Sequence, residues 1–349
     1  MGSQTGVAVS NSTPVVLVTG GGGFLGGAIV DLLLQRGCEV RSLSRRHYPE
    51  LEAKGVQCFQ ADITDIDALR AAATDCDAVM HVAAQAGIWG PRQGYDSVNY
   101  RGTQAVIEAC RLAEVQHLIY TSSPSVIQTD GDCEGADESL GYPRRYRTAY
   151  QASKAAAERA VVAANTAALS TVSLRPRLIW GPGDPHLVPR LVERCRAGRL
   201  RLVGSGDKLV DMTYITDAAQ AHLDAMDRLL EAKEIDCQAA CAGRAYFISS
   251  GEPKPFRLAV NDLMKACRAP LVTRSVPAWL AFSIGALCEL IWTLFALGSE
   301  PPMTRFLARQ LSTANWYDIS AARADLGYEP AVDWRSGLAE LKAHWTTDV

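Results

Sequence analysis

The sequence lacks the features that mark several common classes of protein. Its 349 residues include 35 basic and 38 acidic side chains, with a net charge of −3, and no basic tract indicates a nucleic-acid partner. The ten cysteines are scattered, and none forms a C-x-x-C pair. Neither a disulfide framework nor a metal site is therefore expected, and a reducing, cytosolic compartment is the default interpretation.

A targeting segment is not recognisable either. Residues 1–13 are polar, without the charged and apolar regions of a signal peptide, and we interpret them as a disordered leader. Gly6 stands where an N-myristoylation signal requires Ser or Thr. Internal repeats and low-complexity tracts are also lacking. The hydrophobic content, 48%, is enough to bury a sizeable core, which indicates an ordinary globular protein.

The first positive feature is a glycine-rich turn between a strand and a helix. Residues 15–19 (VVLVT) are typical of a strand buried on both faces, and apolar residues at helical spacing follow the turn. Glycines allow the backbone to approach a pyrophosphate, and the helix N-terminus supplies free N–H groups. The segment therefore predicts a dinucleotide cradle, with a plain structural turn as the alternative. Its candidate contacts are Gly20, Gly23, Phe24, Leu25 and Gly26.

The end of the second predicted strand, residues 39–44, bears on the choice between NAD and NADP. An acidic residue at this place would bind the adenosine ribose 2′-hydroxyl. Ser44 stands there instead, and Arg45 follows it. Because an arginine pairs with a 2′-phosphate that a carboxylate would repel, the pattern favours NADP, with NAD as the second choice. The alternative is that Arg45 and Arg46 are solvated surface residues.

Two further strand ends supply candidate cofactor contacts. Residues 57–61 lead to Asp62 and Ile63, where Asp62 either accepts from the adenine amino group or caps the helix predicted over 67–73. Residues 78–84 end in Ala83 and Ala84, which are small enough to let a cofactor pass. His81, within this strand, is interpreted as a packed histidine.

Candidate catalytic residues follow the fifth strand, residues 116–122. Ser123 stands where parallel sheets bind ligands and can donate to a substrate carbonyl, although serines also favour turns. Tyr150 and Lys154 lie four residues apart in a helix-forming run and so share a helix face. An ammonium next to a phenol lowers the phenol pKa, so the pair can exchange protons near neutral pH. Taken alone, such a pair is usually only part of a helix face.

Four motifs in order carry a family resemblance. They are residues 19–26 (TGGGGFLG), 120–123 (YTSS), 150–154 (YQASK) and 174–183 (LRPRLIWGPG). The chain resembles the extended short-chain dehydrogenases/reductases over roughly residues 15–345, and within them the 3β-hydroxysteroid and sterol-4-carboxylate dehydrogenase branch. Residues 121–126, 181–184 and 300–304 most resemble the 2-alkyl-3-oxoalkanoate reductases of bacterial long-chain olefin synthesis. Ile127 departs from the tyrosine that the family often has there, and the Thr-Asp-Glu set of sugar dehydratases is absent.

The resemblance assigns roles to the candidate residues. It implies that Ser123 and Tyr150 bind the substrate oxygen, that Tyr150 is the proton donor, and that Lys154 binds the nicotinamide ribose and lowers the tyrosine pKa. Pro176 is implied as a further cofactor contact. It also implies a homodimer formed through helices over residues 99–113 and 150–164.

The expected activity is NADPH-dependent reduction of a long-chain 2-alkyl-3-oxoalkanoic acid to its 3-hydroxy acid. Oxidation of a 3β-hydroxysteroid or a sterol-4-carboxylate is the alternative. A catalytically silent cofactor-binding scaffold is an alternative of another class, and the complete set of Ser123, Tyr150 and Lys154 argues against it.

These patterns predict an α/β fold. We expect a Rossmann-type, doubly wound parallel sheet over residues 14–180, and a smaller substrate-binding region over 181–349 that is interleaved with the last Rossmann elements. Within the second region, residues 203–210 predict a hairpin around Gly206, and Asp217 is expected to cap a helix.

The stretch that begins with Trp279 and ends with Leu297 is almost wholly apolar. Glu289 is its only charge, and its length just reaches that of a membrane span. Residues 317–328 resemble a family tail that returns to the folded body, which argues against a span. The remaining interpretations are helices that cover an apolar pocket, or a surface for a membrane, a lipid substrate or a partner enzyme. All of them favour a long apolar substrate over a sugar nucleotide.

Overall fold

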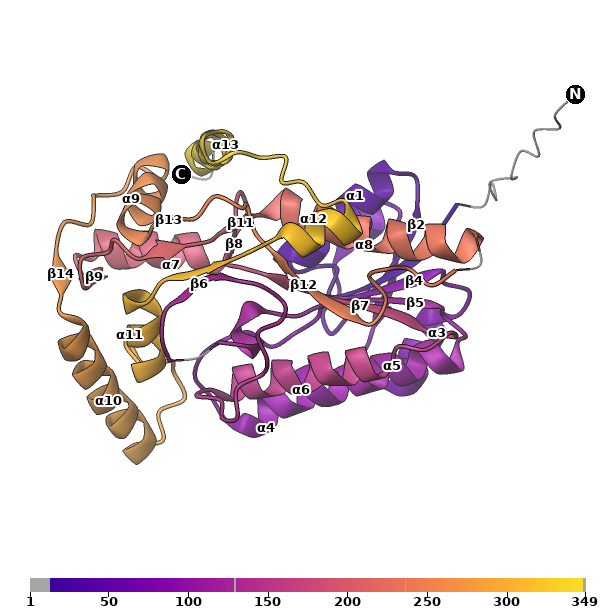
Figure 1. Ribbon diagram of the computed structural model, residues 1–349, viewed down its shortest axis with the longest axis horizontal. Coiled ribbons are helices and arrows are strands. Elements are labelled where there is room, and N and C mark those ends of the chain that lie inside the picture. The colour runs from indigo at the N-terminus through magenta and orange to yellow at the C-terminus, as the bar shows by residue number, and fades with distance from the viewer. Residues whose placement is uncertain (1–12, 129, 236, 348–349) are drawn as a thin grey trace, which may run out of the picture.

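Seven parallel strands form the central sheet of the protein (Figure 1). A computed structural model describes residues 13–128, 130–235 and 237–347, so most of the predicted leader lies outside the described residues. The strand order is β12-β7-β5-β4-β1-β2-β3, which confirms the predicted doubly wound α/β fold. In chain order the strands are β1 (Val15–Thr19), β2 (Glu39–Ser44), β3 (Gln57–Gln60), β4 (Ala78–His81), β5 (His117–Thr121), β7 (Ser170–Pro176) and β12 (Arg244–Ile248).

Alternating side chains divide the core between the two faces of this sheet. Val16 and Val18 of β1 belong to the cluster that packs under one layer of helices, whereas Leu17 between them belongs to the cluster on the other face. The first layer is α1 (Phe24–Gln35), α8 (Ile215–Glu234) and α12 (Ser320–Leu326). The second layer is α3 (Ile66–Ala73), α5 (Gly102–Leu112) and α6 (Ala149–Ala163). Both faces are thus covered, as all-parallel sheets require.

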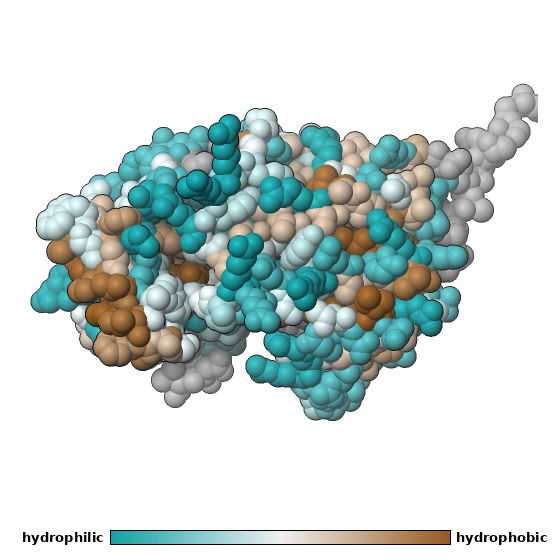
Figure 2. Space-filling view, turned by 90° about the horizontal axis from the view of Figure 1, so that it is seen from below, coloured by the Kyte–Doolittle hydropathy of each residue, from teal (hydrophilic) through white to brown (hydrophobic). Residues whose placement is uncertain are grey.

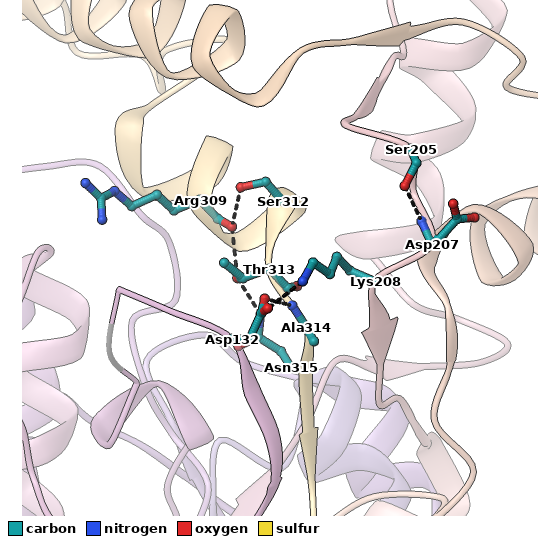
Figure 3. Close-up of polar contacts among 9 residues, drawn as sticks. All are labelled: Asp132, Ser205, Asp207, Lys208, Arg309, Ser312, Thr313, Ala314 and Asn315. Carbon is teal, nitrogen blue, oxygen red and sulfur yellow. Dashed lines mark hydrogen bonds and ion pairs between the residues drawn. The ribbon is translucent and has the colours of Figure 1, made fainter.

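A second sheet joins segments that are far apart in the sequence. Its strands, in order, are β13 (Lys254–Pro255), β10 (Leu209–Val210), β15 (Asn315–Tyr317) and β6 (Cys133–Ala136). Asp132 holds the start of β6 in place, because its carboxylate accepts from the backbone N–H of Ala314 at 2.8 Å and pairs with the Lys208 ammonium (Figure 3). The segment between Ser123 and Tyr150 is therefore fixed from both sides by the C-terminal region.

The two sheets show how the chain regions interleave. Strand β12 comes from the 181–349 region and completes the first sheet, while β6 comes from the 14–180 region and lies in the second. Two pairs of short strands complete the connections: β8 (Ile179–Trp180) with β11 (Thr213–Tyr214), and β9 (Leu202–Val203) with β14 (Ser275–Val276). The 317–328 tail passes through β15 and α12 back to the main body, where Tyr328 is fully buried.

Two local predictions in the C-terminal half are wrong. The segment 203–210 is not a hairpin, because β9 pairs with β14 while β10 pairs with β13 and β15. Asp217 does not cap α8: it lies inside the first turn, and its carboxylate accepts from the backbone N–H of Ala331 at 3.0 Å. In both cases a partner distant in the sequence replaces the local contact that the pattern indicated.

The remaining helices include an apolar helix, α10, at one end of the molecule. They are α2 (Pro49–Ala53), α4 (Arg92–Tyr95), α7 (Leu187–Arg196), α9 (Phe256–Ala266), α10 (Ala278–Leu294), α11 (Arg305–Ser312) and α13 (Trp334–Thr347). Helix α10 buries only Ala281 and Gly285, and it packs on α11 (Figure 1). A Cβ on Gly285 would lie 2.6 Å from the Thr304 carbonyl carbon, so the glycine is what allows this close packing. None of the helices in the described part of the chain combines the length and apolarity that a transmembrane span requires.

Candidate active site

The sheet brings most of the predicted site residues to one edge. Parallel strands end at the same edge, and the candidates stand at or just after six of these ends. They are Gly20 after β1, Ser44 in β2, Asp62 and Ile63 after β3, Ala83 and Ala84 after β4, Ser123 after β5, and Pro176 in β7. Phe24 and Leu25 open α1, and Tyr150 and Lys154 lie in the first two turns of α6.

The glycine-rich turn is packed too closely for side chains. Gly20 has a φ of +75°, and a Cβ there would lie 3.1 Å from the Cα of Ala83. A Cβ on Gly26 would lie 2.1 Å from the carbonyl oxygen of Gly20, so only glycine lets α1 start directly against the turn. Thr19 holds the adjacent end of β4, because its Oγ1 accepts from the N–H groups of Val82 and Ala83 at 3.2 Å.

The groups around this turn fit a dinucleotide. The N-terminus of α1 has no side-chain cap at Gly23, so N–H groups of its first turn remain available for an anion. Ser44 Oγ is buried without a hydrogen-bond partner. Arg45 is exposed, and its guanidinium forms no ion pair with the residues that the structure describes. Free N–H groups, an orphaned hydroxyl and an unpaired cation together suit a pyrophosphate and an adenosine ribose.

Not every predicted cofactor residue is free for such a contact. Asp62 does not cap a helix, because Asp65 occupies that position; instead Asp62 Oδ1 accepts from the N–H and hydroxyl of Thr64, which lowers the carboxyl pKa. Ile63 is buried against Gly102 of α5, where a Cβ would lie 2.7 Å from it. Leu25 and Pro176 are also buried, whereas Ala84 is exposed. The buried side chains can therefore shape the wall of the site, and their backbone groups can contact a cofactor; these residues are Leu25, Ile63 and Pro176.

Tyr48 is a residue of this region that the sequence did not single out. A Cβ on Gly22 would lie 2.4 Å from each of Tyr48 Cε1, Cε2 and Cζ. Equal distances to three ring atoms place that point on the axis through the ring centre, so the ring lies flat on the Gly22 backbone. Tyr48 follows Ser44 by four residues and thus couples the glycine-rich turn to the end of β2. A packing contact of this kind has no signature in a short motif.

The serine and tyrosine of the predicted site are brought together. Helix α6 begins at Ala149 because Thr148 and Gln151 form a reciprocal capping box, and this places Tyr150 in the first turn. The Ser123 side chain lies close enough to the Tyr150 hydroxyl to act on its pKa. Ser123 Oγ also accepts from the Ser125 N–H at 3.2 Å, which starts a short 3₁₀ turn at Pro124. Two hydroxyls therefore converge at the carboxyl end of β5.

Lys154 is buried beneath this pair. Its Nζ donates to the carbonyl oxygen of Thr121 at 2.6 Å and lies 4.3 Å from the centre of the Tyr120 ring. Burial lowers its pKa to about 7, while the Glu158 carboxylate acts in the opposite direction. The lysine can therefore change protonation state near neutral pH, which suits a group that supports proton transfer.

The predicted lowering of the Tyr150 pKa is not what the structure gives. The pKa of Tyr150 is raised, because burial of the phenol outweighs the hydrogen bond from Ser123, which lowers it. Lys154 is not among the causes of this shift, since its ammonium is directed at Thr121 and Tyr120. The i,i+4 spacing therefore predicted the shared helix face, but it could not predict the direction of the lysine side chain.

A buried ion pair lies one helical turn beyond Lys154. Glu158 binds Arg175 of β7 through two hydrogen bonds, of 2.7 and 2.9 Å, and accepts a third from the Tyr142 hydroxyl at 2.7 Å. The glutamate and arginine side chains are 0% and 5% exposed. The i, i+4, i+8 series of Tyr150, Lys154 and Glu158 was visible in the sequence and could have revealed this residue. The pair fixes α6, and with it Lys154, against the sheet.

Asn99 is a third residue, after Tyr48 and Glu158, that sequence reasoning missed. The predicted helix over 99–113 is interrupted: residues Asp96–Arg101 form a π-helical turn between α4 and α5. Asn99 is buried there, accepts from the Gln85 N–H at 2.7 Å, and donates to the Ser153 hydroxyl of α6 at 3.1 Å. It thus connects the loop after β4 with α6, the helix that carries Tyr150 and Lys154. π-helical turns are frequent at functional sites, but no sequence signal marks this one.

Two other buried side chains border the site. His81 is packed, as predicted, between the hydroxyls of Thr19 and Thr103 at 2.8 and 3.0 Å, and burial lowers its pKa to about 3. Tyr95 meets the Tyr150 ring edge-on at 6.3 Å between centroids and donates to the Trp89 carbonyl at 3.0 Å. Both stabilise the position of neighbouring groups.

Comparison with known proteins identifies the family. Residues 17–275 match the model of the 3-beta hydroxysteroid dehydrogenase/isomerase family. The chain belongs to this family. The 2-alkyl-3-oxoalkanoate reductase of Stenotrophomonas maltophilia (strain K279a) is 50% identical, over 94% of this chain and 98% of that protein. The protein of the same name from Shewanella oneidensis (strain MR-1) is 44% identical, over 93% of this chain and 85% of that protein.

Solved structures agree with the architecture. UDP-glucose 4-epimerase of Thermus thermophilus, in complex with NAD, is 26% identical and has a TM-score of 0.71, covering 96% of this chain and 100% of that chain. As a member of the 3-beta hydroxysteroid dehydrogenase/isomerase family, the chain is an oxidoreductase with the extended short-chain dehydrogenase/reductase fold, as predicted. The family is nicotinamide-dependent.

Proposed function

We propose that the protein reduces the 3-keto group of long-chain 2-alkyl-3-oxoalkanoic acids to the 3-hydroxy acids with NADPH. The observation that carries this proposal is the combination of 50% identity, over nearly the full length of a 2-alkyl-3-oxoalkanoate reductase, with a complete Ser123, Tyr150 and Lys154 set. The same set argues against a scaffold without turnover. The reaction is reversible, so the hydroxy acid is a substrate in the opposite direction.

The site residues suggest how the ketone is activated. A ketone oxygen placed between Ser123 and Tyr150 accepts a hydrogen bond from each hydroxyl. Bound NADPH supplies the hydride. Tyr150 gives its proton to the developing alkoxide, and the phenolate that remains is stabilised by the Ser123 hydroxyl. We assign Lys154, one turn further along α6, to the nicotinamide ribose, which is the role that the family resemblance implies for it.

The preference for NADPH rests on the end of β2. Ser44 leaves room where a carboxylate would repel a 2′-phosphate, and the unpaired Arg45 guanidinium can bind that phosphate. Binding of NADPH and NADH can be titrated by cofactor fluorescence. We expect Arg45→Glu to weaken NADPH at least tenfold and to leave NADH within about twofold. Equal losses for both cofactors would assign Arg45 a structural role and remove the support for NADPH.

A second candidate is the oxidation of 3β-hydroxysteroids with NAD. The name of the family model favours it, since it describes a steroid dehydrogenase/isomerase. Purified protein is therefore offered NADP with a long-chain 2-alkyl-3-hydroxy acid, and NAD with a 3β-hydroxysteroid, and nicotinamide absorbance is followed. The hydroxy acid is used because β-keto acids decarboxylate readily. Turnover with NADP and the fatty substrate supports the proposal, and turnover with the steroid and NAD alone overturns it.

The homodimer implied by the resemblance is also a proposal. A shallow hollow of about 730 Å³ runs between α5 and α6, and its lining of small, apolar, polar and charged side chains includes Gln104, Ala160 and Ala164. We place the contact between two copies on these helices. Light scattering should give twice the chain mass, and Ala160→Glu should give the mass of one chain.

A further inference from the structure

Helix α10 presents an apolar face to the outside (Figure 2). Seven of the thirteen exposed large hydrophobic side chains among the described residues lie between positions 279 and 297. Leu294, Trp279 and Leu290 are 72%, 70% and 63% exposed. Positions 279, 287, 290 and 294 recur at helical spacing and form one stripe. The seven residues, which we call the α10 face, are Trp279, Ile284, Leu287, Leu290, Leu294, Phe295 and Leu297.

Three polar side chains next to the α10 face are paired within the protein. Glu289, the only charged residue of the helix, is turned inward and binds Arg305 at 2.6 Å. The Ser283 hydroxyl donates to the carbonyl oxygen of Trp279 at 2.9 Å, and Trp292 Nε1 donates to Ser299 at 3.3 Å. An interface with another protein carries about one hydrogen bond per 100–200 Å². Because these three side chains are already paired, the surface suits hydrocarbon better than a protein partner.

A cluster of arginines adjoins the N-terminal end of α10. Strand β14, which leads into the helix, pairs with β9, so Arg274 lies beside Arg201. The end of α7 contacts the end of α9, where Arg196 donates to the Cys267 carbonyl. None of the cluster forms an ion pair with the described residues. The cluster consists of Arg194, Arg196, Arg199, Arg201, Arg268 and Arg274.

The α10 face and the arginine cluster together indicate one kind of binding partner. We propose that the protein binds peripherally to an anionic phospholipid bilayer, with the α10 face inserted at the level of the headgroups and upper acyl chains. The unpaired arginines provide charge complementarity to anionic headgroups, with Trp279 at the boundary between the two surfaces. At about 25 Å, the 17-residue helix lies along the interface rather than across the bilayer.

Vesicle flotation tests this proposal directly. The full chain is mixed with vesicles of phosphatidylcholine alone, or of phosphatidylcholine with 30% phosphatidylglycerol, and the floated fraction is measured at low and at 0.5 M salt. We expect binding to the anionic vesicles that is at least tenfold stronger than to the neutral ones and that weakens with salt. Failure of the wild-type chain to float with anionic vesicles overturns the proposal.

Two sets of variants locate the contact. Leu287→Asp/Leu290→Asp should reduce binding at least tenfold, while Ile235→Asp, at a leucine-sized side chain 70% exposed on the end of α8, should not. Arg199→Ala/Arg268→Ala/Arg274→Ala should remove the preference for anionic vesicles. The matched triple Arg70→Ala/Arg144→Ala/Arg335→Ala, at exposed arginines elsewhere, should keep it.

Other outcomes assign the α10 face differently. If the leucine variant floats like the wild type, the face is not the contact and the proposal is wrong. The wild-type chain could instead self-associate without binding vesicles. If Leu287→Asp/Leu290→Asp then abolishes that association, the α10 face is an interface between two copies and the proposal is wrong. Circular dichroism of each variant confirms that a loss of binding is not a loss of folding.

Discussion

Charged side chains are usually exposed and large apolar side chains are usually buried, and helices α6 and α10 depart from this rule in opposite ways. α6 buries Lys154 and Glu158, whereas α10 exposes Trp279 and Leu294. In α6 every buried charge has a partner: Thr121 for the lysine and Arg175 for the glutamate. In α10 the exposed apolar groups have none among the described residues. The comparison shows that the partners of α6 lie within the fold, and on the membrane proposal above the partner of α10 lies outside it.

Tyr150→Phe should have the largest effect. It removes the proton donor while keeping the ring that packs on Tyr95, so turnover should fall by about 10³-fold with cofactor affinity within twofold. Steady-state kinetics and a fluorescence titration measure the two quantities. Near-normal turnover would show that the polar side chains of α6 stabilise the fold and that Tyr150 is not the proton donor.

Glu158→Ala should destabilise the protein strongly. It leaves the buried Arg175 guanidinium without its carboxylate, at a cost of roughly 3–5 kcal/mol in the free energy of unfolding. Denaturant unfolding of this variant is compared with Glu231→Ala, which removes an exposed ion pair with Arg228 and should cost at most about 1 kcal/mol. Similar losses in the two variants would contradict the view that α6 depends on internal partners.

Lys154→Met should change how the free energy of unfolding depends on pH. The pKa of Lys154 is lowered from 10.5 to about 7 on folding, so above pH 7 the folded protein releases this proton before the unfolded chain does. The wild type therefore gains stability as pH rises through this window, and the variant lacks the gain. Relative to the variant, the wild type should gain roughly 2–3 kcal/mol between pH 7 and 9 in denaturant unfolding. A difference independent of pH would mean that the lysine stays charged in the folded state.

Leu290→Ala on α10 should have the smallest effect. The side chain is already exposed, so the free energy of unfolding should change by less than about 0.5 kcal/mol. Leu263→Ala, at a leucine of α9 that is 1% exposed, should cost roughly 2–5 kcal/mol in the same assay. A large loss at Leu290 would show that α10 contributes to the core after all.

The sequence predicted the features that depend on near neighbours. The strands, the glycine turn and the helix that carries Tyr150 and Lys154 follow from periodicity and local chemistry, and five of the seven sheet strands lie before residue 130. Contacts between distant segments could not be predicted in this way. The pairing of β10 with β15, the role of Asp217 in binding Ala331, and the direction of the Lys154 ammonium all depend on partners that no local pattern specifies.

In the candidate site too, residues in short motifs were predicted and residues that depend on distant contacts were not. Ser123, Tyr150 and Lys154 were identified because each belongs to a compact motif. Asn99 was missed because its function depends on a π-helical turn and on Gln85 and Ser153, which lie 14 and 54 residues away. The apolar stretch around α10 was recognised, but only the structure shows that its side chains face outward.

The pairing of β6 with β15 has a consequence for the order of events during synthesis. The segment that carries Ser123 and Tyr150 is completed by a strand ending at Tyr317, which the ribosome adds 163 residues after Lys154. At 5–20 residues per second this takes roughly 8–30 s. During that interval the nascent N-terminal half has most of its sheet but an unfinished catalytic edge, so a nascent chain released before residue 317 should bind substrate poorly even if it has folded around its cofactor.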